Sequence, residues 1–153
     1  MNKYVSAVGV AAISLVALAK PVIGHDHATG VVKERMDMME VMAKYMKAIS
    51  ERIKTKTELG AIKADAEAIA GHAPHLIHLF PKGSMQRPTE ARATIWQNWQ
   101  DFEVKANAVE IAAKKLAASD AYDFSALEAS VLALSRTCSG CHEKYRVRKV
   151  KGE

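Results

Sequence analysis

Apolar residues recur along this chain at alternating spacings of three and four positions, in four separate blocks. Such spacing places the apolar side chains on one face of an α-helix, which turns once every 3.6 residues or so, about 100° per residue. The blocks run from Val32 to Ile53, from Leu59 to Ala73, from Ile95 to Leu116 and from Leu127 to Tyr145. The pattern predicts four helices, each with one buried face.

Proline and glycine interrupt the chain between the second and third helices, at Pro74, Pro81, Gly83 and Pro88. Thr89 is a candidate N-cap for the third helix, and residues 125–128, Ser-Ala-Leu-Glu, match a capping box at the start of the fourth. The other connections are short, so successive helices should lie side by side and antiparallel. The predicted fold is all-α: an antiparallel up-down-up-down four-helix bundle that can hold a cofactor in its core.

The amino-acid composition agrees with a helical fold and argues against nucleic-acid binding. Aromatic residues make up only 6% of the chain, whereas alanine, lysine, glutamate and methionine, which favour helices, are frequent. The net charge is +5 over 153 residues, far less basic than the surface of a typical nucleic-acid-binding protein. No nucleic-acid partner is therefore expected.

The N-terminus has the layout of a secretory signal peptide. Lys3 precedes a run of apolar or small residues over 4–18, and Ala17-Leu18-Ala19 fits the A-x-A pattern of a cleavage site. The run is short for a membrane span, which leaves an uncleaved anchor as the alternative. We expect a signal peptide over 1–19, export to the periplasm, and no stable membrane insertion after cleavage.

The rest of the chain is expected to form one domain. Residues 25–30 are polar and have no helical period, so the segment 20–30 should be flexible. Residues 31–153 then hold all four predicted helices, and that length supports one hydrophobic core but not two.

The stretch Cys138-Ser139-Gly140-Cys141-His142 carries the candidate chemistry. C-x-x-C-H is the attachment motif of a c-type haem, and residues three and four apart share one helix face. The two thiols can add to the haem vinyl groups, and His142 then becomes the proximal ligand of the iron. A thiol redox pair would need a βαβ context and a zinc site a second pair of ligands, and the sequence shows neither. We predict one haem c, attached at Cys138 and Cys141.

The motif lies near the C-terminus, and residues 138–146 resemble the C-x-x-C-H-x-x-[YF]-R ending of class II c-type cytochromes, the cytochrome c' family. Residues 32–35, Val-Lys-Glu-Arg, resemble the first-helix pattern of that family, whose arginine lies near the haem. Pro88 followed by Ile95-Trp96 resembles the start of its third helix. The likeness covers roughly residues 28–150.

The resemblance implies two alternatives for the sixth position of the iron. One subgroup leaves it open, is high-spin and binds small gases, while a second supplies a methionine from the first helix, is low-spin and suits electron transfer. In both, the distal residue follows the first-helix arginine by four positions, and Met39 follows Arg35 in this way. Met39 is the predicted distal ligand and Met42 its rival, although a methionine stripe at helical spacing also serves as plain core packing.

Other residues are expected around the haem. Arg35 lies on an apolar helix face and needs an anionic partner, for which a haem propionate is a candidate. Arg146 follows His142 by one turn and either lies beside the imidazole or a propionate, or is solvated at the helix end. Met42, Trp99 and Tyr145 complete the predicted haem pocket.

Three histidines, His72, His75 and His78, are spaced by three across Pro74, which should interrupt the helix. We expect them to be polar surface, with a metal site or an alternative axial imidazole as the other interpretation.

The leading hypothesis is a periplasmic monohaem c-type cytochrome that carries one electron, with a low-spin haem bound by His142 and Met39, and that is not an enzyme. The alternative is a five-coordinate, high-spin cytochrome c' that binds nitric oxide or carbon monoxide. Redox partner proteins are expected. The basic residues from Lys144 onwards are expected to be a solvated helix end, with steering of an acidic redox partner as the other interpretation. The resemblance also implies a homodimer through the first two helices for some members.

Overall fold

The computed structural model describes residues 27–147. The predicted signal peptide (1–19) and most of the segment 20–30 lie outside the described residues. The described chain is all-helical apart from one isolated β-bridge. Four helices form the bundle: α1 (Gly30–Thr55), α2 (Ile62–His72), α4 (Trp99–Ala117) and α5 (Phe124–Tyr145).

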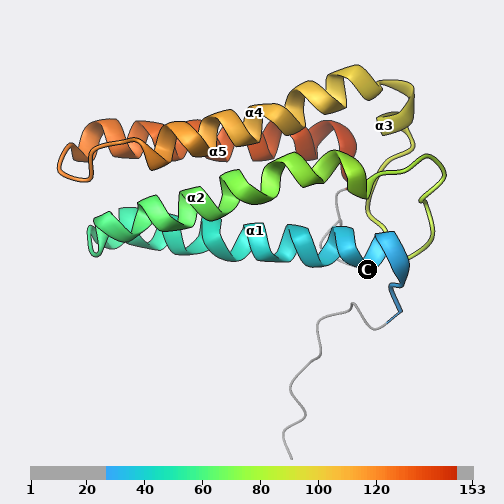
Figure 1. The fold of residues 1–153 in the computed structure, drawn as a ribbon, viewed down its shortest axis with the longest axis horizontal. Helices are drawn as coiled ribbons and strands as arrows, with labels where there is room; N and C mark the ends of the chain where they lie inside the picture. Colours follow the sequence, from blue (N-terminus) through green and yellow to red (C-terminus); the bar gives the residue numbers. More distant parts are fainter. Residues whose placement is uncertain (1–26, 148–153) are drawn as a thin grey trace, which may run out of the picture.

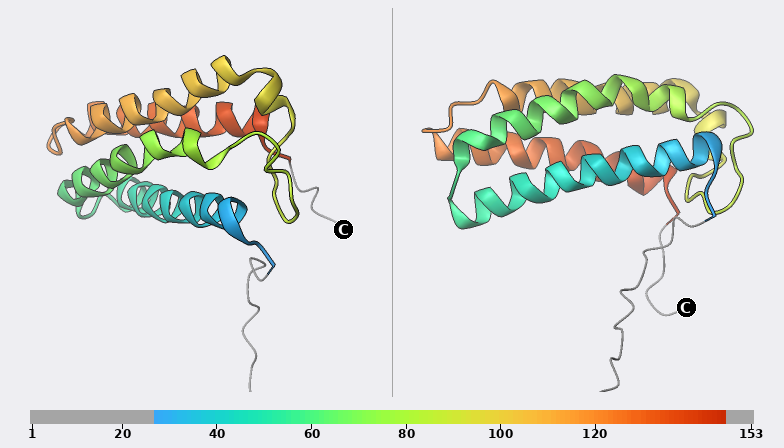
Figure 2. Two further views of the ribbon diagram at one scale, coloured as in Figure 1. Left: turned by 45° about the vertical axis from the view of Figure 1, so that its right-hand side comes forward. Right: turned by 60° about the horizontal axis from the view of Figure 1, so that its bottom comes forward.

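The bundle runs up-down-up-down, with neighbours in sequence lying antiparallel (Figure 1). This confirms the predicted all-α four-helix bundle. Three short elements supplement it: the 3₁₀ helices η1 (Leu59–Ala61) and η2 (Ala73–Leu79), and α3 (Thr94–Gln97). The connection from η2 to α3 loops over one end of the bundle, as Figure 2 also shows.

The core lies along the middle of the bundle and follows the predicted apolar faces. Ile49, Ile62, Ile69 and Leu134 are completely or almost completely shielded from solvent. Helix α2 packs along α1 and α4, and α4 packs along α5, whereas α1 and α5 meet at only a few positions. The bundle is therefore tight around α2 and α4 and open between α1 and α5.

The predicted helix starts need two corrections. The carboxylate of Asp123, not Ser125, caps α5 by accepting a hydrogen bond from the Ala126 amide at 3.0 Å. Thr89 caps no helix, because α3 begins at Thr94 and the Thr89 hydroxyl accepts its hydrogen bonds from Arg35 and from the amide of Ala91. Both corrections arise because several good capping residues lie close together in the sequence, and tertiary contacts select among them.

Pro74 interrupts the second α-helix as predicted, since α2 ends at His72. It lies in the first turn of η2, where a missing N–H costs no hydrogen bond, so the chain continues as a 3₁₀ helix to Leu79. The third predicted helix is also interrupted, at Asn98, which separates α3 from α4.

None of the helices within residues 27–147 is long and apolar enough to cross a membrane.

Candidate haem site

A cavity of about 440 Å³ lies between α1 and α5, at the end of the bundle covered by the connection to α3. Small-molecule and cofactor pockets usually measure roughly 300–1,000 Å³. The residues of α1 that line it are Met36, Met39, Glu40 and Ala43, together with Arg35. Met39 and Glu40 are neighbours that each lie three or four positions from both Met36 and Ala43, so one face of α1 forms this wall.

The opposite wall comes from the last turns of α5, where Cys141, His142 and Tyr145 line the cavity together with Arg146. Cys138 is half-buried one turn earlier on the same helix. Burial raises the pKa of both thiols, that of Cys141 to about 11. The pKa of His142 is lowered by burial and by the charge of Arg146, which favours the neutral imidazole that binds a metal.

Tyr145 fixes the end of α5 against α4. Its buried hydroxyl donates to Asp101 Oδ2 at 2.5 Å, and its ring meets Phe102 edge-on with centroids 5.4 Å apart. Lys144 Nζ lies 2.9 Å from the same carboxylate oxygen. The Tyr145 hydrogen bond, followed by the one from Lys144, lowers the pKa of Asp101. Because Asp101 belongs to α4, this network fixes the axial position of α5.

Arg146 binds the segment that precedes α3. Its Nε and Nη2 each lie 2.7 Å from Glu90 Oε2. Two backbone hydrogen bonds flank this pair, from Arg92 N to Tyr145 O at 2.9 Å and from Val147 N to Glu90 O at 2.7 Å. Arg146 is therefore held at the rim of the cavity and not free at the helix end.

Arg35 binds the same connecting segment from the side of α1. Its side chain is only 4% exposed and lies 4.2 Å from the centroid of the Phe80 ring. Its guanidinium donates to Leu79 O at 3.0 Å, to Thr89 Oγ1 at 2.8 Å and to Ser84 Oγ at 2.6 Å. These partners are neutral oxygens, and the described residues place no carboxylate among them. Arg35 lines the cavity, and its place beside a haem and its contact with a propionate stay predictions.

The structure separates the methionines of α1. Met39 lines the cavity, whereas Met42 is 8% exposed and belongs to the bundle core. The assignment of Met42 to the haem pocket is therefore corrected: three positions after Met39, it is turned by about 60° around the helix, toward α2. Met38 also packs against the core. Met36 is the second thioether in the cavity wall. It precedes Met39 by three positions, and this helical spacing could have identified it from the sequence.

Trp99 also lies elsewhere than predicted. It does not line the cavity but packs against Phe102, with ring centroids 5.4 Å apart. Phe80, Ile95 and Phe102 are the buried apolar residues that face the cavity. Trp99 follows the break at Asn98, which rotates it away from the direction that an unbroken helix from Ile95 would give.

The three histidines stay at the surface of the molecule. His75 and His78 are exposed, and His72 is half-buried and stacks on Tyr45, with centroids 6.3 Å apart. Within residues 27–147, no group of three or more His, Cys, Asp or Glu side chains is placed to hold a metal ion. The metal-site interpretation is not supported.

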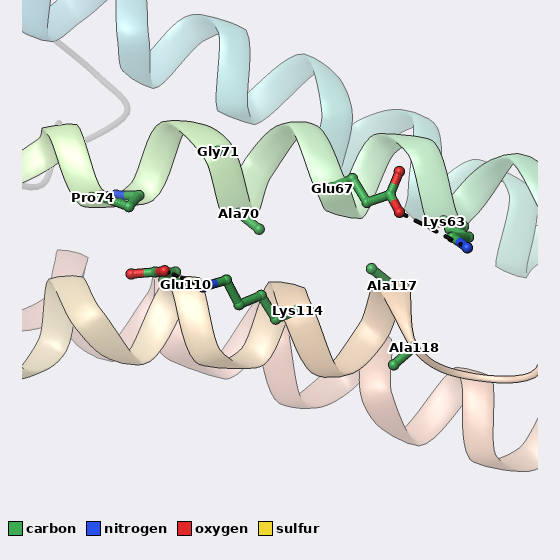
Figure 3. Close-up of a pocket in the computed structure, with 9 residues that line it drawn as sticks. All are labelled: Lys63, Glu67, Ala70, Gly71, Pro74, Glu110, Lys114, Ala117 and Ala118. Carbon is green, nitrogen blue, oxygen red and sulfur yellow. Dashed lines mark hydrogen bonds and ion pairs between the residues drawn. The ribbon is translucent and has the colours of Figure 1, made fainter.

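A second hollow, of about 630 Å³ and wide open to solvent, lies at the surface between α2 and α4 (Figure 3). Its walls are small residues such as Ala70 and Ala117, with the ion pair of Lys114 and Glu110 beside them. None of the thiol, thioether or imidazole groups considered above lines it. It offers no chemistry comparable to that of the cavity between α1 and α5.

The cavity between α1 and α5 fits a haem. One wall provides a thiol and a neutral imidazole with a second thiol one turn away, another provides a thioether, and buried aromatic and aliphatic side chains fill the space between. A bundle of four helices with this donor set is a c-type cytochrome of the helical-bundle class.

A sequence model of the family described as Cytochrome C' matches residues 30–146, and the chain belongs to this family. Cytochrome c' is a standard example of the four-helix bundle. The protein carries one covalently bound haem c, the cofactor of the family.

Individual relatives agree with this family assignment. The chain is 36% identical over 118 residues to the cytochrome c' of Pararhodospirillum photometricum, covering 75% of this chain and 94% of that one. It is 31% identical over 122 residues to a cytochrome c-556 of Agrobacterium tumefaciens, covering 78% and 99%. A solved ferrous variant of cytochrome c' from Alcaligenes xylosoxidans with bound nitric oxide matches with a TM-score of 0.69 at 26% identity, covering 78% and 94%.

Proposed function

We propose that this protein is a periplasmic one-electron carrier whose haem is attached at Cys138 and Cys141 and bound axially by His142 and Met39. The observation that carries the proposal is the placement of Met39 on α1 and His142 on α5 as lining residues of one cavity. A thioether on one side and an imidazole on the other match the ligand set of low-spin electron-transfer cytochromes.

Haem supplies reversible one-electron chemistry at its iron when it is bound. The protein side of that function is to hold the ligands and to exclude water. Burial lowers the pKa of His142, and Phe80, Ile95 and Phe102 provide apolar surroundings. Ligation by histidine and methionine favours a higher reduction potential than ligation by two histidines. No bond-making reaction on a substrate is proposed.

Met39→Ala tests the sixth ligand. The reduced wild type should show a sharp low-spin α band, and Met39→Ala should turn the reduced spectrum high-spin and admit carbon monoxide, because the thioether that blocks the distal face is gone. Met42→Ala is the matched control: it removes a thioether one turn away that faces the core, so the spectrum should stay low-spin. In every variant the haem should resist acid–acetone extraction, since the thioether bonds at Cys138 and Cys141 are covalent.

Two results would contradict this assignment. A Met39→Ala protein that stays low-spin while Met36→Ala turns high-spin would give the ligand role to Met36. A wild type that is already high-spin would favour the second candidate function, a five-coordinate cytochrome c' that binds nitric oxide or carbon monoxide. The nitric oxide complex of the Alcaligenes xylosoxidans relative supports that candidate, and Met39 would then be the side chain crowding an open iron.

Export is part of the proposal. The signal-peptide layout of residues 1–19 supports it, with residues 31–153 as the cytochrome domain. N-terminal sequencing of the periplasmic protein should begin near Lys20, whereas a sequence beginning at Met1 would indicate an anchored form. We also propose redox partner proteins, and a homodimer through the first two helices on family resemblance alone.

A further inference from the structure

Glu90 and Arg146 form an ion pair at the rim of the haem cavity that sequence reasoning missed. Both residues line the cavity. Two guanidinium nitrogens of Arg146 lie 2.7 Å from one oxygen of Glu90. The Glu90 side chain is 26% exposed and that of Arg146 54%, so the carboxylate is the more sheltered partner.

The backbone brings these two side chains together. Arg92 N donates to Tyr145 O and Val147 N donates to Glu90 O, and an antiparallel bridge joins Ala91 to Arg146. Because the backbone is already paired on both sides, holding the ion pair requires less ordering of the chain than an isolated surface pair does.

The pair lies close to the proximal ligand in the proposed haem site. Arg146 follows His142 by one helical turn, and its amide donates to His142 O at 3.0 Å. Both side chains of the pair line the same cavity as His142, so a haem bound there would experience the charge that the pair presents.

We propose that Glu90 is a positioning residue that keeps Arg146 at the rim of the haem cavity and, with it, sets the charge that the haem iron experiences. This inference rests on the proposed haem attachment at Cys138 and Cys141 with His142 as ligand. It does not depend on the identity of the sixth ligand.

Electrostatics gives the sign of the effect. The ferric centre carries one more positive charge than the ferrous one, so a nearby carboxylate stabilises the ferric state and a nearby guanidinium destabilises it. In the wild type the two charges largely cancel. Removing one partner leaves the charge of the other uncompensated, and it is screened less at this partly sheltered rim than it would be in open solvent.

The test is the reduction potential of the haem-loaded protein, measured by spectroelectrochemistry at low ionic strength. Glu90→Gln should raise the potential, because Arg146 loses its counter-charge. Arg146→Gln should lower it, because the negative charge of Glu90 is then no longer offset by the charge of Arg146. The double variant should return close to the wild-type value, and Glu90→Asp, which keeps the charge, should shift it less than Glu90→Gln does.

Glu110→Gln is the matched control. Glu110 is 25% exposed and pairs with Lys114 at 2.5 Å on α4, in the hollow between α2 and α4 that Figure 3 shows. Its substitution removes the same charge from an ion pair of similar exposure, but it does not line the haem cavity. The potential should remain at the wild-type value.

Several results would overturn the role of Glu90. These are a haem-loaded Glu90→Gln with unchanged potential, a shift matched by Glu110→Gln, or opposite single effects that do not cancel in the double variant. If Glu90→Gln fails to load haem, Arg146→Gln and Glu90→Asp still test the sign. Failure of the proposed site is distinguishable, because haem would then be lost on acid–acetone extraction of the wild type itself.

Discussion

Two arginines bind the same connecting segment, one from each helix that borders the cavity. Arg35 of α1 holds Leu79, Ser84 and Thr89, and Arg146 at the end of α5 holds Glu90. Their chemistry differs. Arg35 is buried among carbonyl and hydroxyl oxygens, and burial lowers its pKa, whereas Arg146 is half in solvent and faces a carboxylate. The helix faces predict where both side chains lie, but their partners are some 50 residues away in sequence and show no pattern.

A further residue-scale prediction concerns Asp101, whose pKa is lowered by its hydrogen bonds from Tyr145 and Lys144. A carboxylate whose pKa is lower in the folded than in the unfolded state stabilises the fold above the unfolded pKa of about 3.9 and loses this effect as pH falls through the folded value. Asp101→Asn should therefore lower the urea midpoint at pH 7, and its difference from the wild type should shrink toward pH 3.

Asp37→Asn is the control for this effect. Asp37 pairs with Lys33 one turn away on the exposed side of α1, and such pairs contribute little. Equal losses of stability for Asp101→Asn at pH 7 and pH 3 would contradict the ionic contribution.

At the scale of elements, helical periodicity predicted the four bundle helices because each buries one continuous apolar face. The last residue of the fourth block, Tyr145, is also the last residue of α5. The break at Asn98 had no such signal, because neither proline nor glycine marks it. It accompanies long-range contacts, among them the hydrogen bond from Trp96 Nε1 to Phe80 O at 3.0 Å.

The start of α5 gives an element-scale prediction. Asp123→Ala should destabilise the protein by about 1 kcal/mol, because the Ala126 amide loses its capping acceptor. Ser125→Ala should change stability by less than about 0.5 kcal/mol, since Ser125 lies inside the first turn. Urea unfolding of the two variants compares them directly, and a larger loss for Ser125→Ala would restore the capping box as the true start.

Some residues of the candidate haem site can be predicted from the sequence, whereas others become apparent only from the fold. Spacings of three and four positions within α5 bring Cys141 and His142 to the same side of the helix as Cys138, and the four-residue offset from Arg35 points to Met39. Met42 was misassigned because a heptad-like stripe serves both the core and the cavity, and only the positions of α2 and α5 divide it between them. Glu90 and Phe80 lie in an aperiodic connection, so the sequence offers no rule that places them at the cavity.

At the scale of the whole molecule, the bundle is asymmetric. Helix α2 packs along both α1 and α4, while α1 and α5 meet at few positions, and the cavity lies between α1 and α5. A haem bound between α1 and α5 would supply apolar contacts to both helices and would therefore be a structural part of this end of the bundle. The other end is held by protein packing alone.

This asymmetry predicts how the protein responds to the loss of haem. A triple variant, Cys138→Ala, Cys141→Ala and His142→Ala, cannot attach or ligate haem and leaves an apolar hollow of about 440 Å³ open. Hydrogen–deuterium exchange should then rise in the cavity-facing part of α1 and in the segment 79–92 that Arg35 and Arg146 hold. Amides of α2 and α4 near Ile69 and Ala113, which are fully buried in the core, should stay protected, because local opening follows local packing. A uniform loss of protection in all four helices, compared with the haem-loaded wild type, would instead show that the cofactor holds the entire bundle together.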